Sequence, residues 1–197
     1  LYIEFTLSVT MKTKVNKDSR NLLIAMLIGD GSISKQHGFR MCHTAPQKEY
    51  LDWKVKQLRD AGIKVSEPAK YICGKGYCLG KEVYYSRVNV IPFIKVLRRV
   101  VYKDRKITAN RKLLNRLDAK GIAILFMDDG CLNKRTTKGK VHGFYIRISL
   151  CLPKDDCQVF IDYFREVWNI SFYTFSEGRG TYSLCCGTAE GIKFIDI

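Results

Sequence analysis

Two uninterrupted apolar runs in this chain each end in an aspartate that is followed by a glycine. They cover residues 22–31 and 121–130, and the two aspartates are Asp30 and Asp129. Because no polar stripe interrupts either run, both predict helices that are buried on most sides. An ionised carboxylate at the end of such a helix is costly to bury unless it is paired or binds a metal. The runs therefore indicate a two-fold arrangement with a carboxylate pair, and hence a metal-dependent reaction centre.

The segments that follow the two runs also match each other, which indicates an internal repeat. Residues 46–63 align with residues 153–170 at an offset of 107, and residues 94–97 align with residues 192–195 at an offset of 98. The two aspartates lie 99 residues apart, so the second copy has eight additional residues, which fit an enlarged hairpin at 136–143. The fold class that follows is α/β (α+β), with two pseudo-symmetric αββαββα repeats.

Alternation of apolar and polar positions predicts the hairpin strands. Over residues 143–152 the apolar face consists of Phe144, Ile146, Ile148 and Leu150. The polar face of the same strand consists of Tyr145, Arg147, Ser149 and Cys151. Over residues 83–90 the polar face consists of Tyr85, Arg87 and Asn89. Helices with an apolar stripe are expected over residues 47–61 and 154–168, and Asp18 or Ser19 is expected to cap the first apolar helix.

The net charge of the chain indicates which class of molecule it binds. Its 34 Lys and Arg residues against 19 Asp and Glu residues give a net charge of +15. Such an excess favours a polyanion, most simply nucleic acid, and a basic protein without such a partner is the alternative. No apolar run is long enough to span a bilayer, and residues 1–10 lack the pattern of a signal peptide. No membrane partner is expected. The expected location is intracellular, in an organelle matrix or the cytoplasm.

The cysteines and histidines do not indicate a metal centre of their own. The eight cysteines lack the paired short spacing of a zinc site and are expected to be reduced, structural thiols. A zinc-dependent binding module is therefore the least favoured alternative. His37, His43 and His142 are too scattered for a histidine metal centre, and all three are expected at the surface or facing DNA.

Basic, amide and tyrosine side chains are concentrated in the predicted hairpins and their turns. A sheet with such a face can lie in the DNA major groove, where Arg and Lys read guanine and Gln and Asn read adenine. Other cations on the same face would contact phosphates. The candidate DNA-binding residues are Ser34, Lys35, Gln36, Arg40, Lys70, Lys75, Tyr77, Lys81, Tyr85, Arg87, Asn133, Lys134, Arg135, Lys138, Lys140, Tyr145, Arg147 and Arg179.

The two apolar runs resemble the two motifs of a single-chain LAGLIDADG homing endonuclease. Residues 23–31 (LIAMLIGDG) are a loose form of the nine-letter motif, and residues 126–130 (FMDDG) resemble the second motif of one branch of the family. The resemblance extends over nearly the whole chain from about Asn16. It implies two motif helices packed along a pseudo-two-fold axis and sheets that form a saddle over a long DNA target.

The resemblance also implies the catalytic residues. One acidic residue from each motif, Asp30 and Asp129, would hold divalent cations against the scissile phosphates, with backbone carbonyls near Gly29 and Asp128 as further ligands. Mg²⁺ is the expected cation, and Ca²⁺ and Mn²⁺ are candidate substitutes. Hard oxygen ligands suit these ions, and metal ions activate water and stabilise the leaving oxygen. Lys106 matches a basic residue of the family, and Arg105 is a competing candidate.

The repeat and the resemblance together give an expected division of the chain. It consists of a leader at 1–15, a first repeat at 16–105, a linker at 106–118 and a second repeat at 119–197. A counterpart of Lys106 would fall near position 204, so the second repeat is expected to be shortened at its C-terminus, or else to have lost one basic residue. The expected function is site-specific double-strand cleavage of DNA in intron homing by a monomer. The alternative is a non-cutting protein of the same fold, either an RNA maturase with intron RNA as its partner or a DNA-binding regulator.

Overall fold

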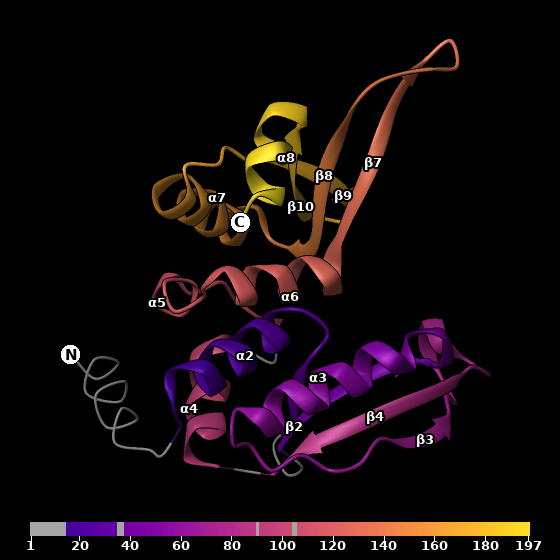
Figure 1. Cartoon of the computed structure of the whole chain (residues 1–197), viewed down its shortest axis with the longest axis vertical. Coiled ribbons are helices and arrows are strands. Elements are labelled where there is room, and N and C mark those ends of the chain that lie inside the picture. Colours follow the sequence, from indigo (N-terminus) through magenta and orange to yellow (C-terminus); the bar gives the residue numbers. More distant parts are fainter. Residues whose placement is uncertain (1–14, 35–37, 90, 104–105) are drawn as a thin grey trace. The chain divides into compact units, whose positions relative to one another are not determined.

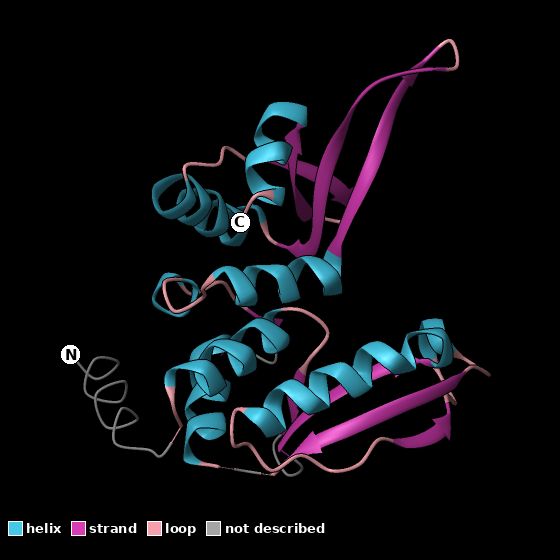
Figure 2. Cartoon of the chain, in the orientation of Figure 1, coloured by secondary structure: helices cyan, strands magenta, loops and turns pink. Residues whose placement is uncertain are grey.

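The computed structural model describes residues 15–34, 38–89, 91–103 and 106–197, without the side chains of Tyr77, Lys103, Lys106 and Ile107. The chain divides into two compact units, of which the first ends at Val100 and the second begins at Val101. Each unit contains one four-stranded antiparallel sheet with helices packed against it (Figures 1 and 2).

The first unit follows the order helix, hairpin, helix, hairpin, helix. Its elements are α2 (Lys17–Ile28), β1 (Ser32–Ser34), β2 (Gly38–Thr44), the short 3₁₀ helix η1 (Ala45–Gln47), α3 (Lys48–Asp60), β3 (Ala69–Ile72), the 3₁₀ helix η2 (Gly76–Cys78), β4 (Glu82–Val88) and α4 (Pro92–Val101). The strands are arranged in the order β1-β2-β4-β3. Helix α3 packs on β2 and β4, at the centre of the sheet.

The second unit repeats this order after a short connecting segment. That segment contains β5 (Tyr102–Lys103), β6 (Lys106–Ile107) and α5 (Arg111–Leu114). The repeated elements are α6 (Ala119–Asp129), β7 (Gly130–Thr137), β8 (Lys140–Leu152), α7 (Lys154–Trp168), β9 (Tyr173–Gly178), β10 (Thr181–Gly187) and α8 (Thr188–Ile195). The strand order β7-β8-β10-β9 is the same as in the first unit, so the αββαββα repeat expected from the sequence is confirmed.

The strand registers show which residues of the two units correspond. In the first unit Ser32 lies opposite Arg40, and in the second Cys131 lies opposite Arg147. Ser32 and Cys131 each follow their motif aspartate by two residues, so Arg40 and Arg147 occupy the same place in the two sheets. The β7–β8 hairpin is the longer one and turns at Lys138 and Gly139, within the segment where the sequence predicts an enlargement.

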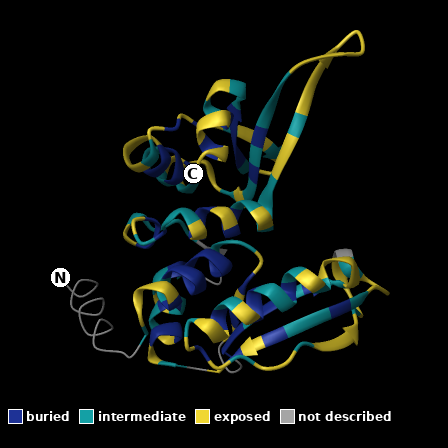
Figure 3. Ribbon diagram, viewed as in Figure 1, coloured by how far each residue is buried: buried dark blue, intermediate teal, exposed yellow. Residues whose placement is uncertain are grey.

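One face of each sheet forms the core of its unit. In the first unit the core includes Phe39 and Met41 on β2 and Leu51, Val55 and Leu58 on α3. In the second unit it includes Ile146 and Ile148 on β8 and Phe160, Tyr163 and Phe164 on α7. The helix predicted over residues 154–168 is observed over those residues. Figure 3 shows how buried and exposed residues are distributed over these elements.

Helix α2 is buried along most of its length, as its unbroken apolar run predicts. Its first turn differs from the expectation, because Asn16 is the N-cap and its side chain accepts a hydrogen bond from the Ser19 backbone N–H at 2.7 Å. Neither Asp18 nor Ser19 occupies the cap position. Asparagine is as favourable an N-cap as aspartate or serine, so propensity alone does not separate these three residues.

The alternation predicted for residues 143–152 holds at Ile146 and Ile148 and fails at the end of the strand. Leu184 pairs with Ile148 while Tyr182 pairs with Leu152, so β8 contains extra residues between these two pairs. Cys151 adopts a left-handed conformation, with φ of +51°. A bulge of this kind re-aims the side chains that follow it, so Leu150 and Cys151 do not continue the two faces.

The cysteines and the helices carry two further findings. All eight cysteines are free, and burial raises the pKa of the Cys157 and Cys186 thiols to about 11. Such thiols behave as small apolar core groups.

Among the described residues, no helix has the length and apolar content needed to cross a bilayer.

Candidate functional site

The two motif aspartates stand at corresponding places in their units. Asp30 follows the C-cap residue Gly29 of α2, and Asp129 is the last residue of α6. Each comes two residues before the strand residue that lies opposite the central arginine of its sheet. Asp128 instead corresponds to Gly29. Each helix therefore ends in one equivalent carboxylate, at the end where the helix dipole favours a cation.

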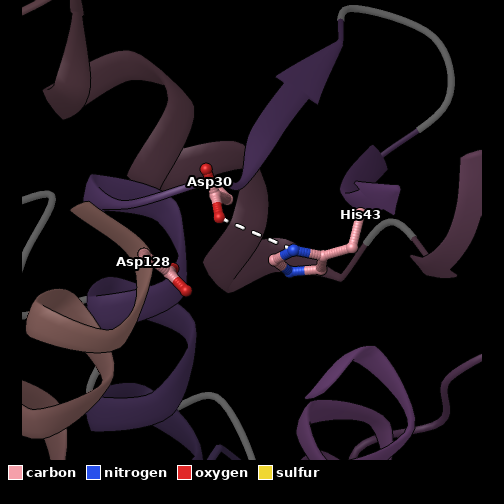
Figure 4. A group of neighbouring side chains, drawn as sticks. All are labelled: Asp30, His43 and Asp128. Atoms are coloured by element: carbon pink, nitrogen blue, oxygen red, sulfur yellow. Dashed lines mark ion pairs between the residues drawn. The ribbon is translucent and has the colours of Figure 1, made fainter. Parts of the chain in front are cut away.

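Asp30 lies beside a buried histidine within the first unit (Figure 4). The distance from Asp30 Oδ2 to His43 Nδ1 is 3.7 Å, and the side chain of Asp30 is 35% exposed while that of His43 is 1% exposed. The expectation that His43 lies at the surface or faces DNA is wrong, because alternation along β2 places it on the buried face with Phe39 and Met41, and α3 packs on this strand. His142 is exposed, and His37 is outside the described residues.

A buried lysine contacts the other side of the same histidine. Lys54, on α3, is fully buried, and its Nζ lies 3.1 Å from His43 Nε2. The Lys54 ammonium also lies 4.4 Å from the centroid of the Tyr50 ring, and the Tyr50 and His43 rings are in edge contact at 5.1 Å. Asp30, His43 and Lys54 thus form a continuous series of polar contacts that runs from the end of α2 into the core.

The face of the first sheet opposite α3 carries an arginine pair. Arg40 and Arg87 lie directly opposite each other on β2 and β4. The guanidinium of Arg40 lies 4.4 Å from the Tyr85 ring centroid and 5.1 Å from that of Tyr71, and Arg87 lies 5.0 Å from the Tyr85 ring. Within the part of the chain that the structure describes, no carboxylate pairs with either arginine. Like charges in this arrangement destabilise a sheet, and an anionic ligand on this face would relieve their repulsion.

On the corresponding face of the second sheet, a carboxylate balances the charge of the central arginine. Arg147 Nη2 lies 3.0 Å from Glu177 Oε1, and Ser183 Oγ donates a hydrogen bond to the same carboxylate. The guanidinium of Arg147 also lies 5.4 Å from the ring of Phe175. A shallow pocket of about 160 Å³ opens on this face. Its lining consists of Arg135, Tyr145, Arg147, Tyr173, Phe175 and Cys185.

The other predicted DNA-binding residues are distributed over the faces, edges and turns of the two sheets. The strand registers place Ser34 with Arg40, and Asn133, Arg135 and Tyr145 with Arg147. Lys134 lies opposite Phe144 and shares the core-side face of its strand. The residues in loops and turns, all exposed, are Lys75, Lys81, Lys138 and Arg179. Lys140 is exposed at the start of β8.

Lys70, like Arg147, is a predicted contact that pairs with a carboxylate of its own sheet. Its Nζ lies 3.2 Å from Glu82 Oε2, and Tyr84 donates a hydrogen bond to the other oxygen of that carboxylate at 2.6 Å. The hydrogen bond from Tyr84, together with Lys70, lowers the pKa of Glu82 below its usual range. Five candidate site residues lie wholly or partly outside the described residues. Lys35, Gln36 and Arg105 are not described at all, and Tyr77 and Lys106 are not described beyond the backbone.

Sequence reasoning missed two features of the site, and each has a signal. Lys54 lies three residues after Leu51 and four before Leu58, so helical spacing places it on the apolar stripe of α3. Glu177 is an acid within a predicted basic hairpin, a departure that itself indicates an internal ion pair. The aromatic residues Tyr71, Tyr173 and Phe175 have no such signal, because aromatic residues are common in strands on either face.

The residues at the two helix ends fit a divalent metal. Both offer carboxylate oxygens, which Mg²⁺ and Ca²⁺ prefer, and the side chain of Asp30 is 35% exposed, which leaves it accessible to an ion. The donor set contains no cysteine, so it does not have the thiolate character of a structural zinc site.

Comparison with known proteins defines the class to which this arrangement belongs. Residues 20–194 match the model of the LAGLIDADG DNA endonuclease family, so the chain belongs to this family. The homing endonuclease I-WcaI bound to its DNA recognition sequence has the same fold, with a TM-score of 0.75 and 17% identity over 95% of this chain and 83% of that one. The N-terminal LAGLIDADG domain of DUF199/WhiA has a TM-score of 0.55 and 13% identity over all of this chain and 89% of that one.

A curated relative is similar in sequence over most of the chain. Protein RecA of Mycolicibacterium fallax is 26% identical over 188 residues, which are 89% of this chain and 42% of the relative. The chain therefore spans about two fifths of the length of that relative. At these identities, the similarity to the solved structures establishes the fold alone.

Proposed function

We propose that this chain is a divalent-metal-dependent endonuclease that cuts double-stranded DNA at a long, specific site, as in intron homing. The observation that carries the proposal is the equivalence of Asp30 and Asp129. Each lies at the C-terminal end of a motif helix, α2 or α6, and precedes the hairpin whose central arginine lies on the outer sheet face. Membership of the LAGLIDADG DNA endonuclease family supports the same activity.

The catalytic chemistry divides between the bound metal and the chain. Mg²⁺ held by the two carboxylates would supply an activated water and stabilise the leaving oxygen of the phosphodiester, and Ca²⁺ and Mn²⁺ are candidate substitutes. Asp30 and Asp129 would hold the cations, aided by backbone carbonyls of Gly29 and Asp128. Lys106 would balance charge near one scissile phosphate.

The two sheet faces would bind the DNA. Arg40 and Arg87, with Tyr85 beside them, present two guanidinium groups without carboxylate partners among the described residues. Arginine forms paired hydrogen bonds with guanine in the major groove, and the exposed turn lysines would contact phosphates. The homing endonuclease I-WcaI, which has the same fold, is bound to its DNA recognition sequence. A monomer would cover the site with repeats at 16–105 and 119–197, joined by 106–118.

Strand cleavage in the presence of Mg²⁺ tests the proposal. The target is first selected from a randomised duplex library by its cut products. Asp30→Asn and Asp129→Asn should each lower the cleavage rate at least ~10³-fold, a loss of about 4 kcal/mol of transition-state stabilisation. DNA affinity should be retained, because the substitutions preserve shape and the sheet faces are untouched. Asp60→Asn, which removes a surface carboxylate paired with Lys56, is the matched control and should cut normally.

The alternative function gives a different result in the same assay. A non-cutting regulator or maturase of this fold would bind duplex DNA or intron RNA, and no cut product would form with Mg²⁺, Mn²⁺ or Ca²⁺. Retention of binding by a wild-type protein that does not cut would replace the endonuclease proposal with the binding one.

A further inference from the structure

Lys54 is a charged residue in a place where the fold does not require charge. It is fully buried on the core stripe of α3, beside Leu51, Val55 and Leu58. Lysine is almost never fully buried unless it is paired, and taking its ammonium out of water costs several kcal/mol. A side chain with this cost is retained for what it contacts.

The second unit shows that the same scaffold folds with apolar residues at these positions. At the offset of 107 that relates Arg40 to Arg147, Lys54 corresponds to Ile161. His43 corresponds to Leu150 by this offset and to Leu152 by strand register, since His43 pairs with Tyr84 and Leu152 with Tyr182. Ile161 is buried on α7, which packs on β8 and β10. The Lys54–His43 pair is therefore specific to the first unit, because the same fold forms in the second unit with apolar residues at these positions.

The contacts of His43 define which of its nitrogens carries the proton. A lysine ammonium can only donate hydrogen bonds, so the 3.1 Å contact from Lys54 Nζ makes His43 Nε2 an acceptor. In the neutral ring the proton is then on Nδ1, the nitrogen that faces Asp30 Oδ2 at 3.7 Å (Figure 4). That distance exceeds a hydrogen bond, but contacts in catalytic sites commonly shorten when substrate binds.

We propose that Lys54 is a positioning residue for the first metal-binding carboxylate. It fixes the Nδ1–H tautomer of His43, which directs an N–H group at Asp30 and orients that carboxylate, whereas the second unit has apolar residues, a leucine and Ile161, at the positions of this pair. The inference rests on the proposed function and adds that the two acids are held unequally. The strand whose cleavage depends on Asp30 is therefore the one that depends on Lys54.

The test compares three variants of the full chain with one control. The pair His43→Leu and Lys54→Ile together installs the apolar residues of the second unit, and it should fold as stably as the wild type or more so, because buried polar pairs are often replaced without loss. His43→Gln keeps one acceptor for Lys54 and one donor for Asp30, so it should retain function. Lys54→Ile alone leaves His43 Nε2 without the hydrogen bond from the Lys54 ammonium. Lys56→Ile, at an exposed lysine on the same helix, is the control.

Three measurements separate positioning from a general structural role. Nitrogen-15 NMR of the histidine side chains should show the proton of His43 on Nδ1 in the wild type and redistributed in Lys54→Ile. Titration of the protein–DNA complex with Mn²⁺, followed by electron paramagnetic resonance, should show one of two sites weakened about 10–100-fold in the double variant, the usual effect of losing an outer-shell partner. Strand-resolved cleavage should slow by a similar factor on one strand, while DNA affinity stays unchanged.

The opposite results overturn the proposal. A wild-type His43 with its proton on Nε2 would contradict the tautomer, and equal slowing of both strands, or an unchanged Mn²⁺ titration, would make Lys54 a purely structural residue. The first two measurements need no turnover. A wild-type protein that binds DNA but never cuts it would therefore refute the proposed function, and the NMR and Mn²⁺ results would still decide the role of Lys54.

Discussion

At the scale of single residues, the two motif glycines are required by lack of space. A Cβ placed on Gly31 would lie 2.3 Å from the Met26 carbonyl oxygen and 2.9 Å from the Phe39 ring. The Gly31 N–H donates a hydrogen bond of 2.7 Å to that same carbonyl, which closes the end of α2. A Cβ on Gly130 would lie 2.4 Å from the Phe126 carbonyl oxygen. Both glycines let the chain turn tightly from a helix into the first strand, with the aspartate immediately before.

Gly31→Ala should therefore destabilise the protein. The added methyl group meets a backbone oxygen, which cannot rotate away, so we expect a loss of about 1–3 kcal/mol, the usual cost of overpacking. Urea unfolding followed by circular dichroism measures it. Gly74→Ala is the control, because a Cβ there meets no atom within 4 Å, and its midpoint should match that of the wild type. Equal midpoints for the two variants would contradict the steric explanation.

At the scale of elements, sequence periodicity predicts most of the fold. Helix α7 is observed over the residues at which its stripe predicts it, and the offsets between repeats locate both hairpins and their partner helices. Periodicity fails where side chains from distant segments decide the outcome. The tail of β8 bulges because Cys151 adopts a left-handed conformation, and the charge of Lys54 suggests exposure although its spacing places it inside. His43 becomes buried through pairing across the sheet and packing on α3, which no local pattern contains.

The two sheets also differ in how the charges of their equivalent arginines are balanced. Arg40 lies opposite Arg87, whereas Arg147 lies opposite Cys185 and pairs with Glu177. The first sheet thus carries an opposed pair of like charges, which costs stability, and the second carries a salt bridge supported by Ser183. A local rule broken in one repeat and obeyed in the other is expected where the first has a binding role.

Opposite effects on stability should follow from removing these charges. Arg87→Gln relieves the repulsion with Arg40, and because Arg40 keeps its contact with Tyr85, we expect an equal or higher urea midpoint together with weaker DNA binding. Arg147→Gln leaves Glu177 and its hydrogen-bonded Ser183 without a cation, and it should lower the free energy of unfolding by up to about 1 kcal/mol, since the pair is partly exposed. If both variants lowered the free energy of unfolding, the charges of the two arginines would be balanced in the same way in the two sheets, and the explanation would be wrong.

At the scale of the whole molecule, the charge of +15 serves two separable purposes if the ligand is DNA. Cations that contact phosphates supply affinity that falls with salt and is blind to sequence. Guanidinium groups that reach base edges supply discrimination. Lys138 and Lys140 are exposed at the turn between β7 and β8, whereas Arg40 lies within a sheet face between two tyrosine rings. We therefore expect the first two to contact phosphates and the third to contact a base.

Salt titration should distinguish these roles. Plots of log affinity against log salt concentration, measured by fluorescence anisotropy between about 50 and 200 mM salt, should lose about 0.9 of slope for each phosphate contact removed in the variant Lys138→Gln, Lys140→Gln. That variant should bind target and random duplexes more weakly by the same factor. Arg40→Gln should leave most of the slope intact and lose about 1–3 kcal/mol of discrimination at one base pair. If the lysine variant instead relaxed specificity while its salt slope stayed that of the wild type, the hairpin tip would be reading bases, and the division of charge between backbone and base contacts would be reversed.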